Sequence, residues 1–211
     1  PELPNLSVGI ATVMSKYNAG KEYDLLDYVY DHLEFDDFGA LYVRGDTHDP
    51  DARDIDANSY VTFMETARKR ARSKKKQTGF RGKLFSAINA TSTDLLMRSI
   101  QDDCFVTFGR AGRNMVVMDD EGTISPCEVL EHFIHTGRAT LETAVFGNIR
   151  DYDYDIRKLL NTDHAHAIIN YIHNSRCYCS FECAMAVNVL YSPHLWPGIL
   201  KHLKFSDTVS D

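Results

Sequence analysis

The first 103 residues of this 211-residue chain contain no cysteine, and no apolar run in the chain approaches the roughly 20 residues that cross a bilayer. The N-terminus also lacks the basic-then-apolar pattern of a secretion signal. These absences argue against a membrane protein and a disulfide-stapled miniprotein, so we expect a cytoplasmic chain without a membrane partner. With 44% hydrophobic and 25% charged residues, the chain can form one large or two small domains with a buried core.

Acidic residues are missing from one segment, 67–83, which carries nine lysines or arginines although the net charge of the chain is −7. Such a run can meet an anionic partner, and nucleic acid is the obvious candidate. A solvated helix end or linker is the commoner meaning, and no aromatic residue lies between 68 and 76 to stack on bases. We therefore interpret the run as a linker and do not expect a nucleic-acid partner.

The N-terminal part has the pattern of a βαβ unit. Residues 7–14 are β-branched and apolar, which predicts a strand buried on both faces. Residues 21–33 have helical spacing, and 38–43 predict a second strand. This order predicts a parallel sheet with a right-handed crossover, followed by a helix near 56–72.

After the basic run the pattern changes, which places a domain boundary between 72 and 85 and predicts two domains, 1–78 and 79–211. Thr91 and Asp94 are spaced as a helix N-cap pair, for a helix that ends near 101. The remaining expected elements are a β-hairpin (114–118 and 123–125 around a turn at 119–122), a helix at 163–176, and a short helical end near 203 broken by prolines.

All five cysteines follow residue 100: Cys104, Cys127, Cys177, Cys179 and Cys183. In a chain without a secretion signal, thiols grouped in this way favour a metal site over disulfides. Cys179 and Cys183 would face the same side if their segment is helical. Thiolates bind iron–sulfur clusters and zinc alike, so spacing alone leaves both open.

Three motifs carry a resemblance to a known family. They are Gly-Thr-Ile-Ser-Pro-Cys-Glu at 122–128, Phe-Gly-Asn-Ile-Arg-Asp at 146–151, and Cys-Tyr-Cys-Ser-Phe-Glu-Cys at 177–183. In this order they resemble the G-x4-C, GN-I/L-R and cysteine elements of SPASM and twitch domains, the auxiliary-cluster domains that follow radical S-adenosylmethionine (AdoMet) barrels. Residues 12–18 and 43–46 resemble late strands of the same barrels.

The resemblance implies an α/β fold: the C-terminal part of a radical AdoMet barrel in 1–78, then a small α+β SPASM/twitch-like domain in 79–211. It implies a radical AdoMet oxidoreductase whose auxiliary 4Fe–4S cluster is held by cysteines among the five. AdoMet and a second 4Fe–4S cluster belong to the full-length enzyme. The expected partners are a peptide or small-molecule substrate and an electron donor such as flavodoxin or ferredoxin.

The chain departs from the family in two places. The C-x3-C-x2-C motif that ligates the AdoMet-cleaving cluster is absent, so these residues alone should not cleave AdoMet. The family's first auxiliary cysteine sits just before an Ala-Gly pair, whereas Ala111-Gly112 here follows Gly109 and Arg110.

The sequence leaves open the role of one further residue and one alternative function. Arg44, at the end of the second strand, either contacts AdoMet or substrate or forms an ordinary salt bridge with Asp46 or Asp49. The alternative function is a non-enzymatic zinc or iron–sulfur module that recognises a partner, with nucleic acid bound through residues 68–83 as the candidate.

Overall fold

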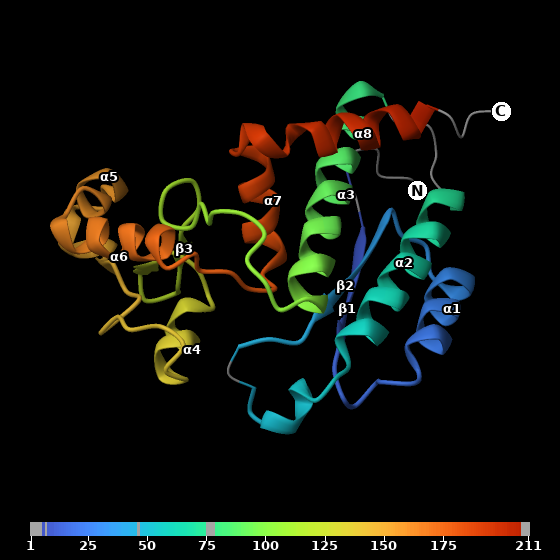
Figure 1. Cartoon of the computed structure of the whole chain (residues 1–211), viewed down its shortest axis with the longest axis horizontal. Coiled ribbons are helices and arrows are strands. Elements are labelled where there is room, and N and C mark those ends of the chain that lie inside the picture. Colours follow the sequence, from blue (N-terminus) through green and yellow to red (C-terminus); the bar gives the residue numbers. More distant parts are fainter. Residues whose placement is uncertain (1–5, 7, 46, 75–78, 208–211) are drawn as a thin grey trace. The chain divides into compact units, whose positions relative to one another are not determined.

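The computed structural model describes residues 6, 8–45, 47–74 and 79–207, without the side chains of 72–74 and 205–207. The chain divides into two compact units, 1–78 and 79–211 (Figure 1). This division falls within the 72–85 range that the change of pattern indicates. The basic run lies partly outside the described residues, because 75–78 are not among them.

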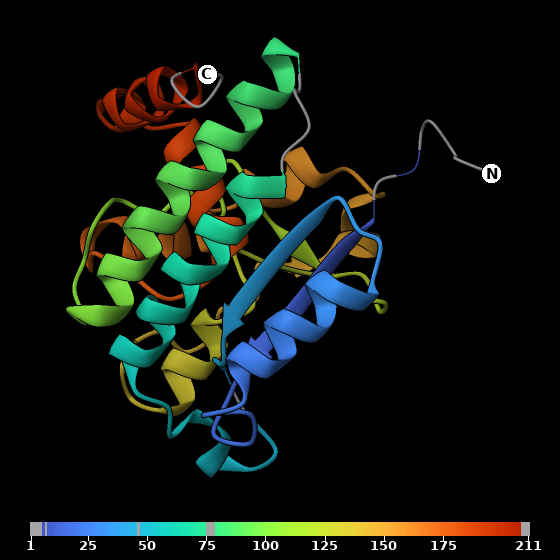
Figure 2. The ribbon, with the colours of Figure 1, turned by 90° about the vertical axis from the view of Figure 1, so that its right-hand side faces the viewer.

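Unit 1 is a βαβ arrangement with a further helix. Figures 1 and 2 show β1 and β2 side by side, and their residues pair in parallel from Gly9 with Asp37 to Met14 with Tyr42. The predicted parallel sheet and its connecting helix are therefore confirmed. The elements in order are β1 (Gly9–Met14), α1 (Glu22–His32), β2 (Asp37–Tyr42), η1 (Pro50–Arg53) and α2 (Ala57–Lys74).

The helices α1 and α2 pack together against the two-stranded sheet. Tyr60 of α2 is fully buried and donates its hydroxyl hydrogen to the Ala40 carbonyl of β2 at 3.0 Å. Along β1, Met14 is buried whereas Val13 is 48% exposed. The prediction that this strand is buried on both faces is wrong, because strand side chains alternate and one face of β1 is exposed.

Unit 2 is mainly helical and contains a small antiparallel sheet. Its first helix, α3 (Phe80–Gln101), starts well before the predicted cap at Thr91. Thr91 is instead buried inside the helix, where its hydroxyl donates to the Ala87 carbonyl at 2.8 Å. The remaining elements are β3 (Val117–Met118), β4 (Thr123–Ser125), α4 (Leu130–His135), β5 (Gly147–Asn148), η2 (Ile149–Tyr152), α5 (Ile156–Leu160), α6 (Asp163–Asn174), α7 (Glu182–Leu190), η3 (Pro193–Leu195) and α8 (Trp196–Asp207).

The predicted hairpin is confirmed, and a third strand joins it. β3 pairs with β4, and β4 pairs with β5, both antiparallel. Gly122 closes the hairpin turn with φ +85°, a conformation that favours glycine. On β5, Gly147 also has a positive φ of 147°, and the Asn148 side chain accepts the Arg150 N–H at 3.0 Å.

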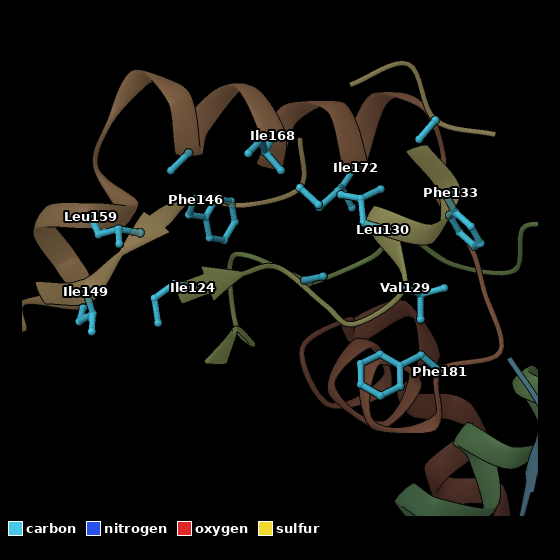
Figure 3. Packing of buried hydrophobic residues seen from close by; sticks show 14 residues of the cluster. Ile124, Val129, Leu130, Phe133, Phe146, Ile149, Leu159, Ile168, Ile172 and Phe181 are labelled. Carbon is cyan, nitrogen blue, oxygen red and sulfur yellow. The ribbon is translucent and has the colours of Figure 1, made fainter. Parts of the chain in front are cut away.

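A hydrophobic core holds the sheet, α4, α5 and α6 together. Figure 3 shows its side chains, among them Ile124 of β4, Leu130 of α4 and Ile168 of α6. Burial of such side chains stabilises a fold by about 1.5–3 kcal/mol each. A second, smaller cluster joins α3, α7 and α8 through Ala87, Val189 and Ile199. The predicted helical spacing of 163–176 is confirmed by α6.

The fold class is therefore mixed α/β, with small sheets and a majority of helix. Across the described residues, no helix combines the length and the apolarity needed to cross a membrane.

The hairpin turn supports a pH prediction. The Asp119 carboxylate accepts the N–H groups of Thr123 at 2.8 Å and Glu121 at 3.0 Å, and the Thr123 bond chiefly lowers its pKa below the ordinary 3.8. A lowered folded-state pKa gives stability that is complete above 3.8 and lost as the pH falls through the folded value. We expect Asp119→Ala to melt earlier than wild type at pH 6, with the difference shrinking below pH 3.8. Thermal melts from pH 2.5 to 6 measure this, with Asp120→Ala as control; a difference independent of pH would contradict it.

Candidate functional site

Three of the five cysteines line one small cavity of unit 2, with a volume of about 40 Å³. We name it the cysteine cavity. Its wall comes from three places: the loop after α3, the residue after Pro126, and the chain from the end of α6 into α7. The lining residues are Val106, Thr107, Gly109, Ala111, Cys127, Ile172, Cys177, Tyr178, Cys179, Phe181, Ala184, Met185 and Asn188.

Cys127 is held between the hairpin and α4. The fully buried Pro126 precedes it, and β4 ends one residue earlier, so the sheet fixes the backbone at this point. The backbone N–H groups of Val129 and Leu130 donate to its sulfur. Hydrogen bonds of this kind to sulfur are among the means by which proteins tune metal–thiolate centres.

Cys177 is placed by the end of α6. The Cys177 N–H donates to the Ile172 carbonyl at 3.2 Å, and the Arg176 N–H donates to the His173 carbonyl at 3.3 Å. Arg176 has φ +52°. These two bonds and the left-handed residue make a Schellman motif, which ends the helix and turns the chain sharply. The turn sends 177–181 along the cavity wall.

The other two thiols, of Cys104 and Cys183, do not line the cavity. Cys104 follows α3, where its N–H bonds to the Ser99 carbonyl at 3.3 Å, and it is partly buried. Cys183 is exposed on the first turn of α7. Because α7 begins at Glu182, Cys179 lies before the helix, so the helical condition for Cys179 and Cys183 to share one face is not met.

Burial raises the pKa of two cavity thiols, Cys127 and Cys177. Desolvation raises the pKa of Cys177 to about 12, the Cys179 and Cys127 thiols add to the rise, and the Arg138 guanidinium opposes it. Burial also raises the pKa of Cys127, against the lowering effect of its two backbone N–H donors. Thiolates are the metal-binding and nucleophilic form of cysteine, so these thiols need a bound cation to ionise.

The donor set bears on which metal would fit. Within the described residues, which include all five cysteines, no three or more His, Cys, Asp or Glu side chains form a group arranged to hold a metal ion. A cubane cluster presents separate iron corners, so its sulfur ligands can come from points further apart. Three of the five thiols, of Cys127, Cys177 and Cys179, line the cavity, and the donor set does not decide between a cluster and a zinc ion.

Gly109 lines the cavity wall, and a second glycine, Gly112, follows the lining residue Ala111. Gly109 lines the cavity, and a Cβ at this position would lie 3.2 Å from the Ile172 side chain. Gly112 has φ +78°, and a Cβ there would lie 2.8 Å from Ile169 and 2.9 Å from Phe146. The Ala111-Gly112 pair is thus packed directly against α6 and the start of β5.

Two buried polar residues of the cavity, Asn188 and Thr107, were not identified from the sequence. Asn188 is 7% exposed, and its side-chain oxygen accepts the Arg110 N–H at 2.7 Å, which ties the loop after α3 to α7. Thr107 is 4% exposed and lies 3.5 Å from His194 through its hydroxyl oxygen. An asparagine inside the apolar segment 182–190 was the available signal, because a buried amide needs a partner.

Arg138 contacts Tyr178, which lies between Cys177 and Cys179 in the part of the chain that lines the cavity. Its guanidinium carbon is 4.4 Å from the Phe133 ring centroid and 4.5 Å from the Tyr178 ring centroid. Its Nη2 donates to the Tyr178 carbonyl at 3.4 Å. The Tyr178 hydroxyl in turn donates to the Asp103 carbonyl at 2.8 Å, so the residue between Cys177 and Cys179 is tied down at both ends.

In unit 1, Arg44 follows β2 by two residues and is partly buried. Its proposed pairing with Asp46 lies outside the described residues, and its contact with AdoMet or substrate stays a prediction. Within the basic run, Arg70 forms an ion pair with Asp31 at 3.3 Å and another with Asp27. These ion pairs join α2 to α1, so at least Arg70 of the basic run contributes to the packing of the two helices.

Exposure predicts the order of thiol labelling in the metal-free chain. Cys183 is exposed, whereas burial raises the pKa of Cys127 and Cys177. We expect iodoacetamide at pH 7.5 to modify Cys183 first and the partly buried Cys127 and Cys177 at least about tenfold more slowly. Peptide mass spectrometry over a time course measures the rates, and addition of denaturant should remove the difference. Equal rates in the folded chain would contradict this placement.

Comparison of the chain with protein-family models, with curated proteins and with solved structures finds no match.

Proposed function

We propose that the chain is part of a radical AdoMet oxidoreductase, in which unit 2 carries an auxiliary 4Fe–4S cluster that supports radical modification of a peptide or small molecule. The observation that carries the proposal is the convergence of Cys127, Cys177 and Cys179 on one cavity. These residues belong to two of the three motifs that resemble SPASM and twitch domains. The third motif, Gly-Asn at 147–148, pairs with Thr123 and Ile124 of β4, and this strand leads into Pro126 and Cys127.

The residues of the cavity suit such a cluster. Cys127, Cys177 and Cys179 would hold it, and Cys183 or Cys104 would supply a fourth thiolate after local movement. When bound, the cluster supplies one-electron redox chemistry, with a potential set by burial, hydrogen bonds and nearby charge. The Val129 and Leu130 N–H groups would stabilise the negative charge on Cys127. The apolar wall formed by Ile172, Phe181 and Met185 would keep water away.

Unit 1 supports the barrel part of the proposal at a coarser level. Its parallel strands β1 and β2, joined through α1, are the repeating element of a (β/α) barrel. In such barrels functional groups lie beyond the C-terminal ends of the strands, and Arg44 is at that end of β2. We therefore keep Arg44 as a proposed contact for AdoMet or substrate.

The experiment for the enzymatic part uses the full reading frame. We expect a C-x3-C-x2-C motif in frame upstream of Pro1, and we expect the full-length protein to reduce AdoMet with dithionite as electron source. One-electron reduction of AdoMet would cleave a carbon–sulfur bond and yield methionine and, after uptake of a hydrogen atom, 5′-deoxyadenosine. Chromatography quantifies that product, and residues 1–211 alone are the control that should form none. A start codon directly before Pro1, or no product from the full-length protein, would contradict the proposal.

A further inference from the structure

Arg110, in the loop after α3, carries a positive charge that forms no ion pair within the part of the chain that the structure describes. Its Nε is shielded from solvent and has no hydrogen-bond partner there. Its Nη2 reaches the Ser192 hydroxyl oxygen only at 3.5 Å, which is long for a hydrogen bond, and a hydroxyl brings no negative charge. Because buried charges in proteins are ordinarily paired, we expect this guanidinium to take an anionic partner.

The groups around the Arg110 guanidinium are polar and largely buried. Ser192 and Thr107 are 0% and 4% exposed, and the Thr107 hydroxyl oxygen lies 3.5 Å from His194 Nε2. The turn at 192–194 therefore meets the loop at 107–110 at two points, each through a long polar contact. The two hydroxyls and the histidine ring can all donate a hydrogen, and none of them is an acid.

The loop and the turn are held in place by the protein itself. The Arg110 N–H donates to Asn188 Oδ1 at 2.7 Å, and Asn188 is 7% exposed on α7. The Leu195 N–H donates to the Ser192 carbonyl at 2.8 Å, which fixes the turn between α7 and η3. The donors are thus presented from a fixed frame, and such preorganisation lowers the cost of ordering side chains when a ligand binds.

We propose that Thr107, Arg110, Ser192 and His194 form an oxyanion site, which binds the carboxylate or phosphate group of a small molecule. The planar guanidinium of arginine presents paired N–H groups that match the oxygens of both anions. The hydroxyls and the histidine ring would donate to the remaining oxygens. This inference goes beyond the proposed function and does not rest on it, because no cysteine takes part and binding is measured without iron.

The same loop offers a matched control in Arg113. This residue is exposed, and its side chain forms no contact with the other described residues. Arg113→Gln therefore removes the same charge as Arg110→Gln, three residues away from the oxyanion site. Ser192→Ala removes one hydroxyl of the site and keeps the charge of Arg110. The three variants separate a specific site from a general attraction of anions to positive charge.

The test is an NMR titration of the isotope-labelled chain with potassium phosphate and, separately, with sodium acetate, at an ionic strength held constant with potassium chloride. We expect saturable shifts confined to 107–110 and 192–194. Arg110→Gln should bind at least about tenfold more weakly, as loss of a charged hydrogen-bonding group predicts. Arg113→Gln should stay within about twofold of wild type, because salt screens exposed charges.

The two anions distinguish the sources of the ligand. Saturation by phosphate alone indicates a phosphorylated molecule, and saturation by acetate alone indicates a carboxylate. Shifts that stay linear with both anions, or equal weakening in Arg113→Gln and Arg110→Gln, would overturn the inference. If circular dichroism shows that Arg110→Gln does not fold, Ser192→Ala replaces it: binding at least about threefold weaker supports the site, and unchanged binding overturns it.

Discussion

Replacement of Cys127 with alanine is expected to reduce bound iron to background and to lower the melting temperature of the iron-reconstituted protein. Cys127 is one of three thiols that line the cavity, and its sulfur receives two backbone N–H donors. Because binding free energy at such a site contributes directly to folding, loss of a ligand removes both the metal and the stability that it brings. Iron analysis and thermal melts of anaerobically reconstituted protein measure the two effects.

The matched control is Cys104→Ala, which removes a partly buried thiol that does not line the cavity. We expect this variant to retain iron. Both substitutions remove a single sulfur, so in the metal-free state each should change the free energy of unfolding by only about 1 kcal/mol. Equal iron content in the two variants would show that the cavity thiols are not the ligands.

The second large effect is expected at Gly112. Its φ of +78° disfavours any side chain, and a Cβ would meet Ile169 at 2.8 Å and Phe146 at 2.9 Å. Both neighbours are side chains packed in the core cluster, so they cannot move freely. Backbone strain and overpacking together predict that Gly112→Ala lowers the free energy of unfolding by about 3 kcal/mol.

Gly137 provides the comparison for Gly112. Its φ is +72°, nearly the same, but nothing lies within 4 Å of a Cβ built there. Gly137→Ala should therefore lose only the conformational part, about 1 kcal/mol. Urea denaturation of both variants measures the difference. Equal losses would mean that the close packing of Ala111-Gly112 against Ile169 and Phe146 does not matter to stability.

Elements whose signals are local were predicted well. The hairpin around Gly122 and the helix α6 follow from a turn-rich tetrapeptide and from apolar spacing, and both are present in the structure. The prediction that Thr91 caps the N-terminus of a helix was wrong, because contacts with distant parts of the chain decide where α3 begins. Gly198 of α8 packs against Thr91, and α3 also contacts α7, so tertiary packing extends the helix through residues that alone suggest a linker and a cap.

The sequence predicted which thiols could form the candidate site, but it did not predict how they are arranged. The sequence identified Cys127, Cys177 and Cys179, yet it could not separate them from Cys104 and Cys183. The separation depends on where α3 and α6 end and where α7 begins. The residue that ends α6 is Arg176, in a left-handed conformation that sequence patterns assign to glycine. The contact of Arg138 with Tyr178 joins residues 40 positions apart and leaves no pattern in the sequence.

The central claim is that this chain binds an iron–sulfur cluster through its cavity thiols. Its most direct measurement is purification without oxygen, reconstitution with iron and sulfide, and then metal analysis with the visible and Mössbauer spectra of the product. We expect a brown protein with iron and sulfide in equal amounts and the spectrum of a 4Fe–4S cluster, lost in Cys127→Ala. A colourless protein that holds stoichiometric zinc and takes up no iron would contradict the account and favour a non-enzymatic zinc module.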